Sequence, residues 1–166
     1  MKTLTVLLVS ALAGFAQAPS TSGGARVDGK PLTVAYAYLF RAPDNWHPEE
    51  TNDVVVLTPK PLDEAAIRKA VTLVDVLKLA PERIVVESHQ AGPADLSICH
   101  PAFDGSCYST TISLPDEWQH AKAENGHLTG RVRILFGRET TVFGKYQIFY
   151  EFTFDAAAAG SFAKRR

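Results

Sequence analysis

The sequence lacks an excess of basic residues. It holds 17 Lys and Arg against 18 Asp and Glu, which gives a formal net charge of -1. A protein that binds nucleic acid needs a basic face to neutralise phosphates, so the composition argues against a nucleic-acid partner.

No hydrophobic run is long enough to anchor the chain in a membrane. The uncharged run Leu4–Phe15 follows Lys2 at the start of the chain. As a helix it would rise about 18 Å, well short of the ~30 Å hydrocarbon core. A basic start followed by a short apolar run is typical of a secretory signal. We therefore expect residues 1–18 to be a signal peptide, and the mature form to have no membrane span.

Cysteine is scarce, and Cys99 and Cys107 are the only two. In an oxidising compartment, a pair this close in sequence favours a disulfide over two free thiols. Closing a ring of about nine residues stabilises the fold by roughly 2.6 kcal/mol on the chain-entropy model. The leader and the cysteine pair together predict a periplasmic or secreted protein.

The sequence contains none of the short motifs that carry nucleophilic catalysis. Gly-x-Ser-x-Gly and Ser-x-x-Lys are both absent, and a disulfide would consume both candidate thiolates. The balance therefore favours a protein that is not an enzyme, and we assign no catalytic residue.

The five histidines do not show the spacing of metal ligands. His-x-His, His-Glu-x-x-His and Cys-x-x-Cys are all absent. The best local clusters are His47 with Glu49 and Glu50, and His100 beside Cys99. We read these histidines mainly as solvated loop residues, and we expect no metal site and no cofactor.

Hydrophobic periodicity predicts a mainly β protein. Strands are expected at residues 32–40, 53–57, 83–89, 96–100, 106–114, 127–136 and 146–154. From Leu62 to Leu79 the apolar residues recur at three and four, which indicates one α-helix. Many short strands with turns between them favour an antiparallel β-sandwich or barrel-like domain.

The chain is expected to form a single β-rich domain over residues 19–155, followed by a flexible C-terminal tail over 156–166. Residues 19–24 have no apolar side chain to bury, which predicts a mobile lead-in. Asp28-Gly29 tolerates positive φ and predicts a tight hairpin. This opening hairpin and the closing strand are expected to be neighbours.

The closing strand has one face made only of large apolar side chains. They are Tyr146, Ile148, Tyr150, Phe152 and Phe154. Such a face can line a ligand cavity in a small barrel, but a one-domain chain needs it for the core, which is the reading that we favour.

The loop Arg41–Asn52 contains the residues that we expect to bind a partner: Trp46, His47, Glu49 and Glu50. Tryptophan flanked by turn residues is a common anchor at interfaces. The alternative is that Trp46 folds back as a lid on the core, because large aromatic side chains are usually buried.

Short segments near both ends resemble a group of uncharacterised small exported bacterial proteins. They are Val27-Asp28-Gly29-Lys30, Tyr36-Ala37-Tyr38, Val54-Val55-Val56-Leu57, Lys60-Pro61-Leu62-Asp63, Gly130-Arg131, Phe143-Gly144-Lys145-Tyr146 and Phe152-Thr153-Phe154-Asp155-Ala156. The resemblance covers the ends better than the middle and leaves out the cysteine segment. It implies export and a β-rich fold, and it implies no activity.

These observations favour an exported, non-catalytic interaction module, such as an inhibitor or immunity-type protein that acts on another secreted or envelope protein. The alternative is a periplasmic hydrolase or a metal-dependent enzyme whose site is assembled from distant residues. Clustered side chains with shifted pKa values in a cleft would favour the enzyme.

We predict that the mature protein begins at Gln17 or at Pro19, because Ala16 and Ala18 both end small-x-small sites. N-terminal sequencing of protein purified from the cell envelope tests this. An intact Met1 in that material would contradict export.

Overall fold

The computed structural model describes residues 20–44, 47, 49–89, 92–120 and 125–163. The expected signal peptide, residues 1–18, lies outside the described residues, and so does Trp46.

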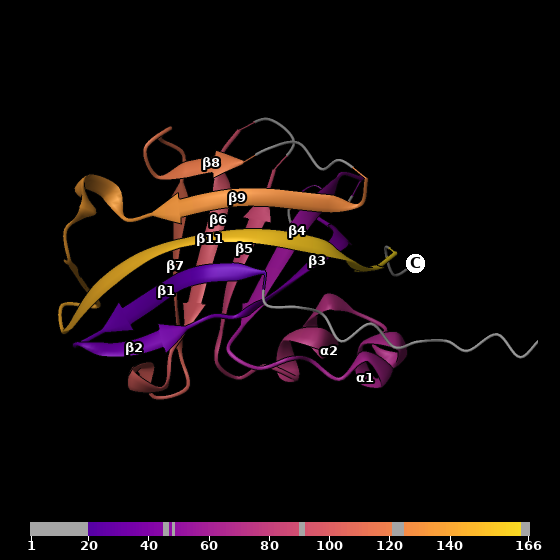
Figure 1. Cartoon of the computed structure of the whole chain (residues 1–166), viewed down its shortest axis with the longest axis horizontal. Helices are drawn as coiled ribbons and strands as arrows, with labels where there is room; N and C mark the ends of the chain where they lie inside the picture. Colours follow the sequence, from indigo (N-terminus) through magenta and orange to yellow (C-terminus); the bar gives the residue numbers. More distant parts are fainter. Residues whose placement is uncertain (1–19, 45–46, 48, 90–91, 121–124, 164–166) are drawn as a thin grey trace, which may run out of the picture.

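The protein is mainly β, as predicted, and its strands are short except for the last (Figure 1). The strands are β1 Thr21–Val27, β2 Lys30–Thr33, β3 Tyr36–Pro43, β4 Thr51–Thr58, β5 Arg83–Ser88, β6 Ala94–Cys99, β7 Cys107–Ile112, β8 Trp118–His120, β9 His127–Arg133, β10 Thr140–Val142 and β11 Tyr146–Ser161. The helices are α1 Glu64–Lys69 and α2 Leu73–Lys78, with 3-10 turns η1 Pro101–Phe103 and η2 Leu135–Gly137.

The described strands belong to one curled sheet in the order β2-β1-β11-β3-β4-β5-β6-β7, and β9 and β10 also pair with β11. β8 extends the sheet by pairing with β9. Strand β11 crosses the protein in Figure 1. It connects the pair β1 and β2 to the strands that run from β3 to β7. Its C-terminal part pairs in parallel with β3, and the other pairings between described strands are antiparallel. The sheet is therefore mixed.

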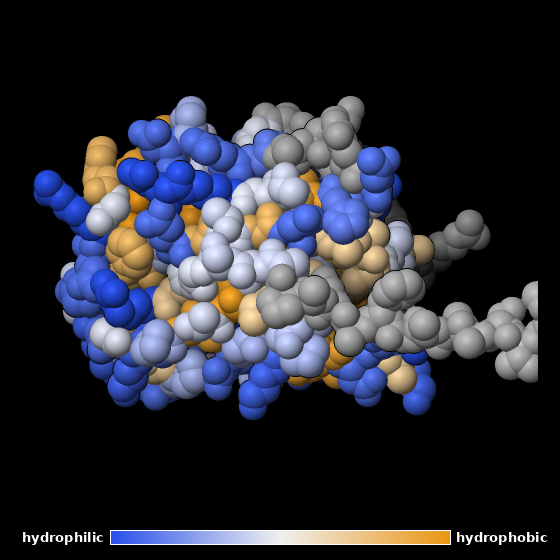
Figure 2. Space-filling model, viewed as in Figure 1, coloured by the Kyte–Doolittle hydropathy of each residue, from blue (hydrophilic) through white to orange (hydrophobic). Residues whose placement is uncertain are grey.

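The concave side of the sheet holds the main hydrophobic core. Side chains that alternate along the strands are buried there, including Val55, Ile84, Val86, Leu96 and Ile98. The large apolar face of β11 joins them: Ile148, Tyr150, Phe152 and Phe154 are buried in this core. Figure 2 shows that hydrophilic residues cover much of the viewed surface, with smaller apolar areas between them.

A second, smaller core lies on the other side of the sheet, under the helices. The helices and the loops beside them pack on residues of β3, β4 and β5 that include Phe40, Val56 and Val85. The Tyr38 hydroxyl accepts a hydrogen bond from the Leu62 amide at 2.8 Å and fixes the entry to α1. On β6 and β7 the same side of the sheet is polar, and Ser97 and Ser109 are hydrogen-bonded to each other there.

The predicted helix between Leu62 and Leu79 forms as two short helices. The Thr72 side chain accepts a hydrogen bond from the Asp75 amide, and the Asp75 carboxylate accepts one from the Thr72 amide. This capping box starts a new helix at Leu73. The apolar spacing continues across the break, so periodicity alone misses it.

Two end segments differ from the sequence predictions. Thr21–Gly24, expected to be a mobile lead-in, belongs to β1 and pairs with β11. A Cβ at Gly24 would overlap the Leu32 carbonyl oxygen, so this glycine permits close strand approach. At the other end, β11 continues to Ser161 beside β3, and Phe162 stacks on Phe40. The expected flexible tail is therefore strand through Ser161.

The predicted Asp28-Gly29 hairpin is present, and β6 and β7 form a second hairpin. Asp28 and Gly29 have φ values of 48° and 76° and join β1 to β2, and β1 pairs with β11 as expected. Cys99 and Cys107 are register partners on β6 and β7, joined by a disulfide with 4.2 Å between their Cα atoms. The disulfide lies next to the turn that connects β6 to β7.

Replacing both cysteines by alanine is expected to lower the free energy of unfolding by about 2.6 kcal/mol, because the unfolded chain regains the entropy of an open loop. Urea unfolding measures this, and the native protein should show no free thiol. The pair Ser97→Ala and Ser109→Ala, two register steps away, should cost less than about 1 kcal/mol. Equal losses in both variants would contradict the prediction.

Candidate functional site

A cluster of polar side chains lies where β3 and β5 end and where β4 and β6 begin. We call it the polar cluster, and its residues are Asp44, Asn52, Glu87, His89 and Asp95. Neighbouring antiparallel strands run in opposite directions, so the end of one strand lies next to the start of its neighbour. The topology therefore gathers residues that are far apart in sequence. Thr111 at the end of β7 donates a hydrogen bond to Asp95 at 2.8 Å.

Asn52 is the buried centre of the polar cluster, with 0% of its surface exposed. Its amide nitrogen lies 2.7 Å from Oδ2 of Asp44 and 2.8 Å from Oε1 of Glu87. These two carboxylates accept both of its hydrogens. Asn52 therefore fastens the end of β3 and the end of β5 to the start of β4.

His89 bridges two carboxylates. Its Nδ1 lies 3.2 Å from Oδ2 of Asp44, and its Nε2 lies 3.2 Å from Oδ2 of Asp95. Partial burial opposes protonation, but the hydrogen bond and charge of Asp95, with the charges of Glu87 and Asp44, outweigh it and raise the pKa of His89 above 6.5. In the imidazolium both ring nitrogens donate, which matches this geometry.

The polar cluster also fixes the base of the loop that follows β3. The buried Asp44 carboxylate accepts a hydrogen bond from the His47 amide at 2.7 Å. The Asp44 amide donates to the Glu50 carbonyl at 3.1 Å, and the Glu50 amide donates to the His47 carbonyl at 2.8 Å. The loop therefore has a hydrogen-bonded base.

Three of the four residues predicted to bind a partner are exposed on this loop. They are His47, Glu49 and Glu50, and a 3.6 Å contact joins His47 to Glu49. The fourth, Trp46, lies outside the described residues.

Sequence reasoning missed the residues beneath the loop. Asp44 lies three residues before His47, the spacing at which an aspartate side chain accepts a hydrogen bond from a turn amide. That local signal was available in the sequence. The partners Asn52, His89 and Asp95 become neighbours only through strand pairing, which the sequence did not reveal.

His100 lies at the other end of these strands and has a structural role. It is buried, its Nδ1 accepts a hydrogen bond from the Ala102 amide, and its Nε2 lies 3.1 Å from the Lys30 carbonyl. Burial lowers the pKa of His100. Because Cys99 is in the disulfide, these two residues do not form a metal-binding pair.

Within the described ranges, no group of three or more His, Cys, Asp or Glu side chains is arranged to hold a metal ion. Among the described helices, none is long and apolar enough to cross a membrane.

Comparison with known proteins finds no matching family, no matching curated protein and no matching solved structure.

We predict that His89 stabilises the fold most below pH 6.5. Because its pKa is higher in the folded state, the contribution is complete below 6.5 and is lost as the pH rises through the folded pKa. Urea unfolding of the wild type and of His89→Gln should show a stability difference that shrinks between pH 6 and pH 9.

The matched variant for this prediction is Asp95→Asn, which removes one of the two carboxylates beside the ring. An NMR titration should give a lower His89 pKa in this variant than in the wild type. A wild-type His89 that titrates at or below 6.5 would contradict the bridged arrangement.

Proposed function

We propose that the protein is an exported, non-catalytic binding module that presents the loop after β3 to another secreted or envelope protein. The observation that carries the proposal is the contrast between the two parts of this loop. Its base is held by the buried Asp44 and Asn52, whereas His47, Glu49 and Glu50 are exposed. A loop that is ordered before binding loses less conformational entropy in the complex.

The proposed location rests on two independent features. The Cys99–Cys107 disulfide is compatible with an oxidising, extracytoplasmic compartment. The apolar run Leu4–Phe15 after Lys2 has the pattern of an export signal. Both features favour the periplasm or the exterior as the place where the loop meets its partner.

The alternative function, a hydrolase, has one observation in its favour. His89 has a raised pKa and stands among carboxylates, as general acids in active sites often do. However, the ring nitrogens face Asp44 and Asp95, and among the described residues no side-chain hydrogen bond joins His89 to a serine, threonine or cysteine. The geometry therefore supports a positioning role for His89 better than base catalysis.

Replacing Trp46 by alanine is expected to weaken partner binding by about 2 kcal/mol or more, since aromatic anchors dominate interfaces. The partner is first obtained by affinity capture on the immobilised mature protein from native envelope extract. Its affinity for the wild type and for Trp46→Ala is then measured by calorimetry. The midpoint of urea unfolding should be nearly unchanged in the variant.

A charge variant and an aromatic control complete this test. Reversing both Glu49 and Glu50 to lysine should also weaken binding, because both side chains are exposed on the loop. Phe136→Ala removes an aromatic side chain that is 79% exposed on η2 and should leave binding unchanged. A large loss of stability with unchanged binding in Trp46→Ala would show that Trp46 is a lid on the core and would contradict the proposal.

A further inference from the structure

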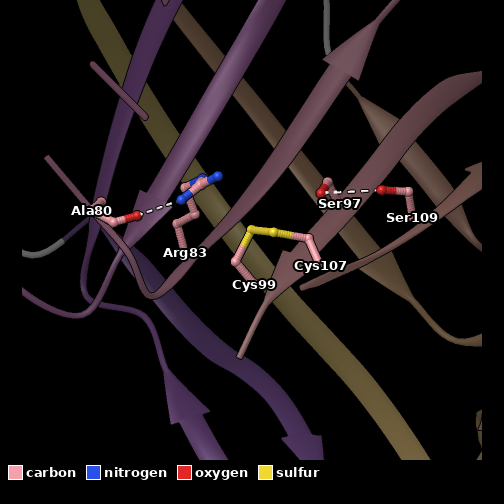
Figure 3. The surroundings of a disulfide bond; sticks show 6 residues. All are labelled: Ala80, Arg83, Ser97, Cys99, Cys107 and Ser109. Atoms are coloured by element: carbon pink, nitrogen blue, oxygen red, sulfur yellow. Dashed lines mark hydrogen bonds between the residues drawn. A yellow bond between two sulfur atoms is a disulfide. The ribbon is translucent and has the colours of Figure 1, made fainter. Parts of the chain in front are cut away.

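Arg83, the first residue of β5, is a half-buried cation in a groove beside α2. Its Nη1 donates to the Ala80 carbonyl at 2.8 Å, and its Nε is buried with no hydrogen-bond partner (Figure 3). No ion pair joins Arg83 to a carboxylate in the described part of the chain. Arginines such as Arg26 and Arg131 pair with glutamates on the exposed surface.

An unpaired guanidinium in such a place is costly. Buried charges are usually paired, because burial removes the water that solvates them. Desolvation is the cause that lowers the pKa of Arg83, with no opposing contribution from a neighbouring carboxylate. Within the described residues, no carboxylate pairs with this half-buried guanidinium, whose Nε is buried.

The groove widens into a cavity on each side of Arg83, and Leu77 and Arg83 line both. One cavity of about 460 Å³ is bounded by Leu73 and Val74 of α2, by Val85 of β5 and by Phe162. This size is within the usual range for small-molecule sites.

The second cavity, also about 460 Å³, is bounded by the Cys99–Cys107 disulfide and by Pro81. Figure 3 shows Arg83 beside Cys99, its register partner on β6. Apolar surface therefore continues past the guanidinium in both directions.

Part of the apolar wall is open to solvent. Val74 on α2 is 57% exposed, and Val71 just before α2 is 68% exposed. The acidic residues Glu87 and Asp44 at the far end of the first cavity are already bonded to Asn52. Glu82 lines the second cavity but makes no ion pair with Arg83.

We infer that the α2 groove binds a small apolar molecule that carries a carboxylate, with the carboxylate on Arg83 and the apolar body against Leu73, Val74 and Leu77. The flat guanidinium fork matches a carboxylate in two parallel hydrogen bonds. The apolar walls remove the rest of the ligand from water. This site goes beyond the proposed function, because it needs no protein partner at the loop.

The test uses three probes that share one alkyl chain: octanoate, octanol and octylamine. Calorimetry on the mature protein should show octanoate binding, with octanol and octylamine at least tenfold weaker. Arg83→Gln should weaken octanoate binding at least tenfold, and Arg83→Lys should retain part of it, since the charge remains but the fork is lost. Arg131→Gln, at an exposed arginine paired with Glu151, is the matched control and should bind octanoate as the wild type does.

A second variant leaves Arg83 unchanged. Val74→Glu adds a carboxylate to the exposed groove wall and should repel octanoate without disturbing the core. Leu114→Glu, at a leucine that is also exposed but lies outside the groove, is its control and should bind normally. Urea unfolding confirms that each variant is folded.

The dipeptide Leu-Leu and its amide distinguish the source of the carboxylate. Binding of the free-acid dipeptide alone, with no binding of octanoate, would assign the groove to peptide C-termini, and binding of octanoate would assign it to fatty-acid-like molecules. Either result supports the inference if Arg83→Gln abolishes the binding of that probe. No binding of any carboxylate probe to the wild type, equal binding of octanol, or binding unchanged in both Arg83→Gln and Val74→Glu would overturn it.

Discussion

The buried amide of Asn52 is the constraint on which the candidate site depends. It holds a carboxylate from the end of β3 and another from the end of β5, both within 2.8 Å. Removing it would take one hydrogen-bond donor from the buried Asp44 carboxylate and one from the half-buried Glu87 carboxylate, and a hydrogen bond to a charged group contributes about 1.5–3 kcal/mol. His89 then adds positive charge between Asp44 and Asp95. The exposed loop therefore stands on a network in which each polar group depends on its neighbours.

The polar residues at one end of the strands differ from those at the other end, because antiparallel pairing brings the start of one strand beside the end of its neighbour. One end has the polar cluster and the loop, and the other has the Cys99–Cys107 disulfide and the buried His100. The groove beside α2 runs along the outer side of the sheet, from Asp44 to the disulfide. A ligand in the groove would therefore lie between the loop base and the disulfide, with its carboxylate on Arg83 beside Cys99.

The sequence supports the β class, the Asp28-Gly29 hairpin, the disulfide and the buried face of β11, because each depends on local pattern or on period-two alternation. It does not reveal the break at Thr72, since a capping box can start a new helix inside a continuous apolar stripe. It also does not reveal that Thr21–Gly24 is strand, because partners across the sheet order that segment. The polar cluster and Arg83 depend on register between distant strands, which no local pattern contains.

Amide hydrogen exchange shows whether the polar cluster holds the loop, because the His47 and Glu50 amides lie at its base. Both are hydrogen-bonded there, to Asp44 and to the His47 carbonyl. We expect both amides to exchange slowly in the wild type and quickly in Asn52→Ala, while amides of β1 and β11 keep their protection. Fast exchange of both amides in the wild type, or unchanged protection in Asn52→Ala, would show that the polar cluster does not hold the loop.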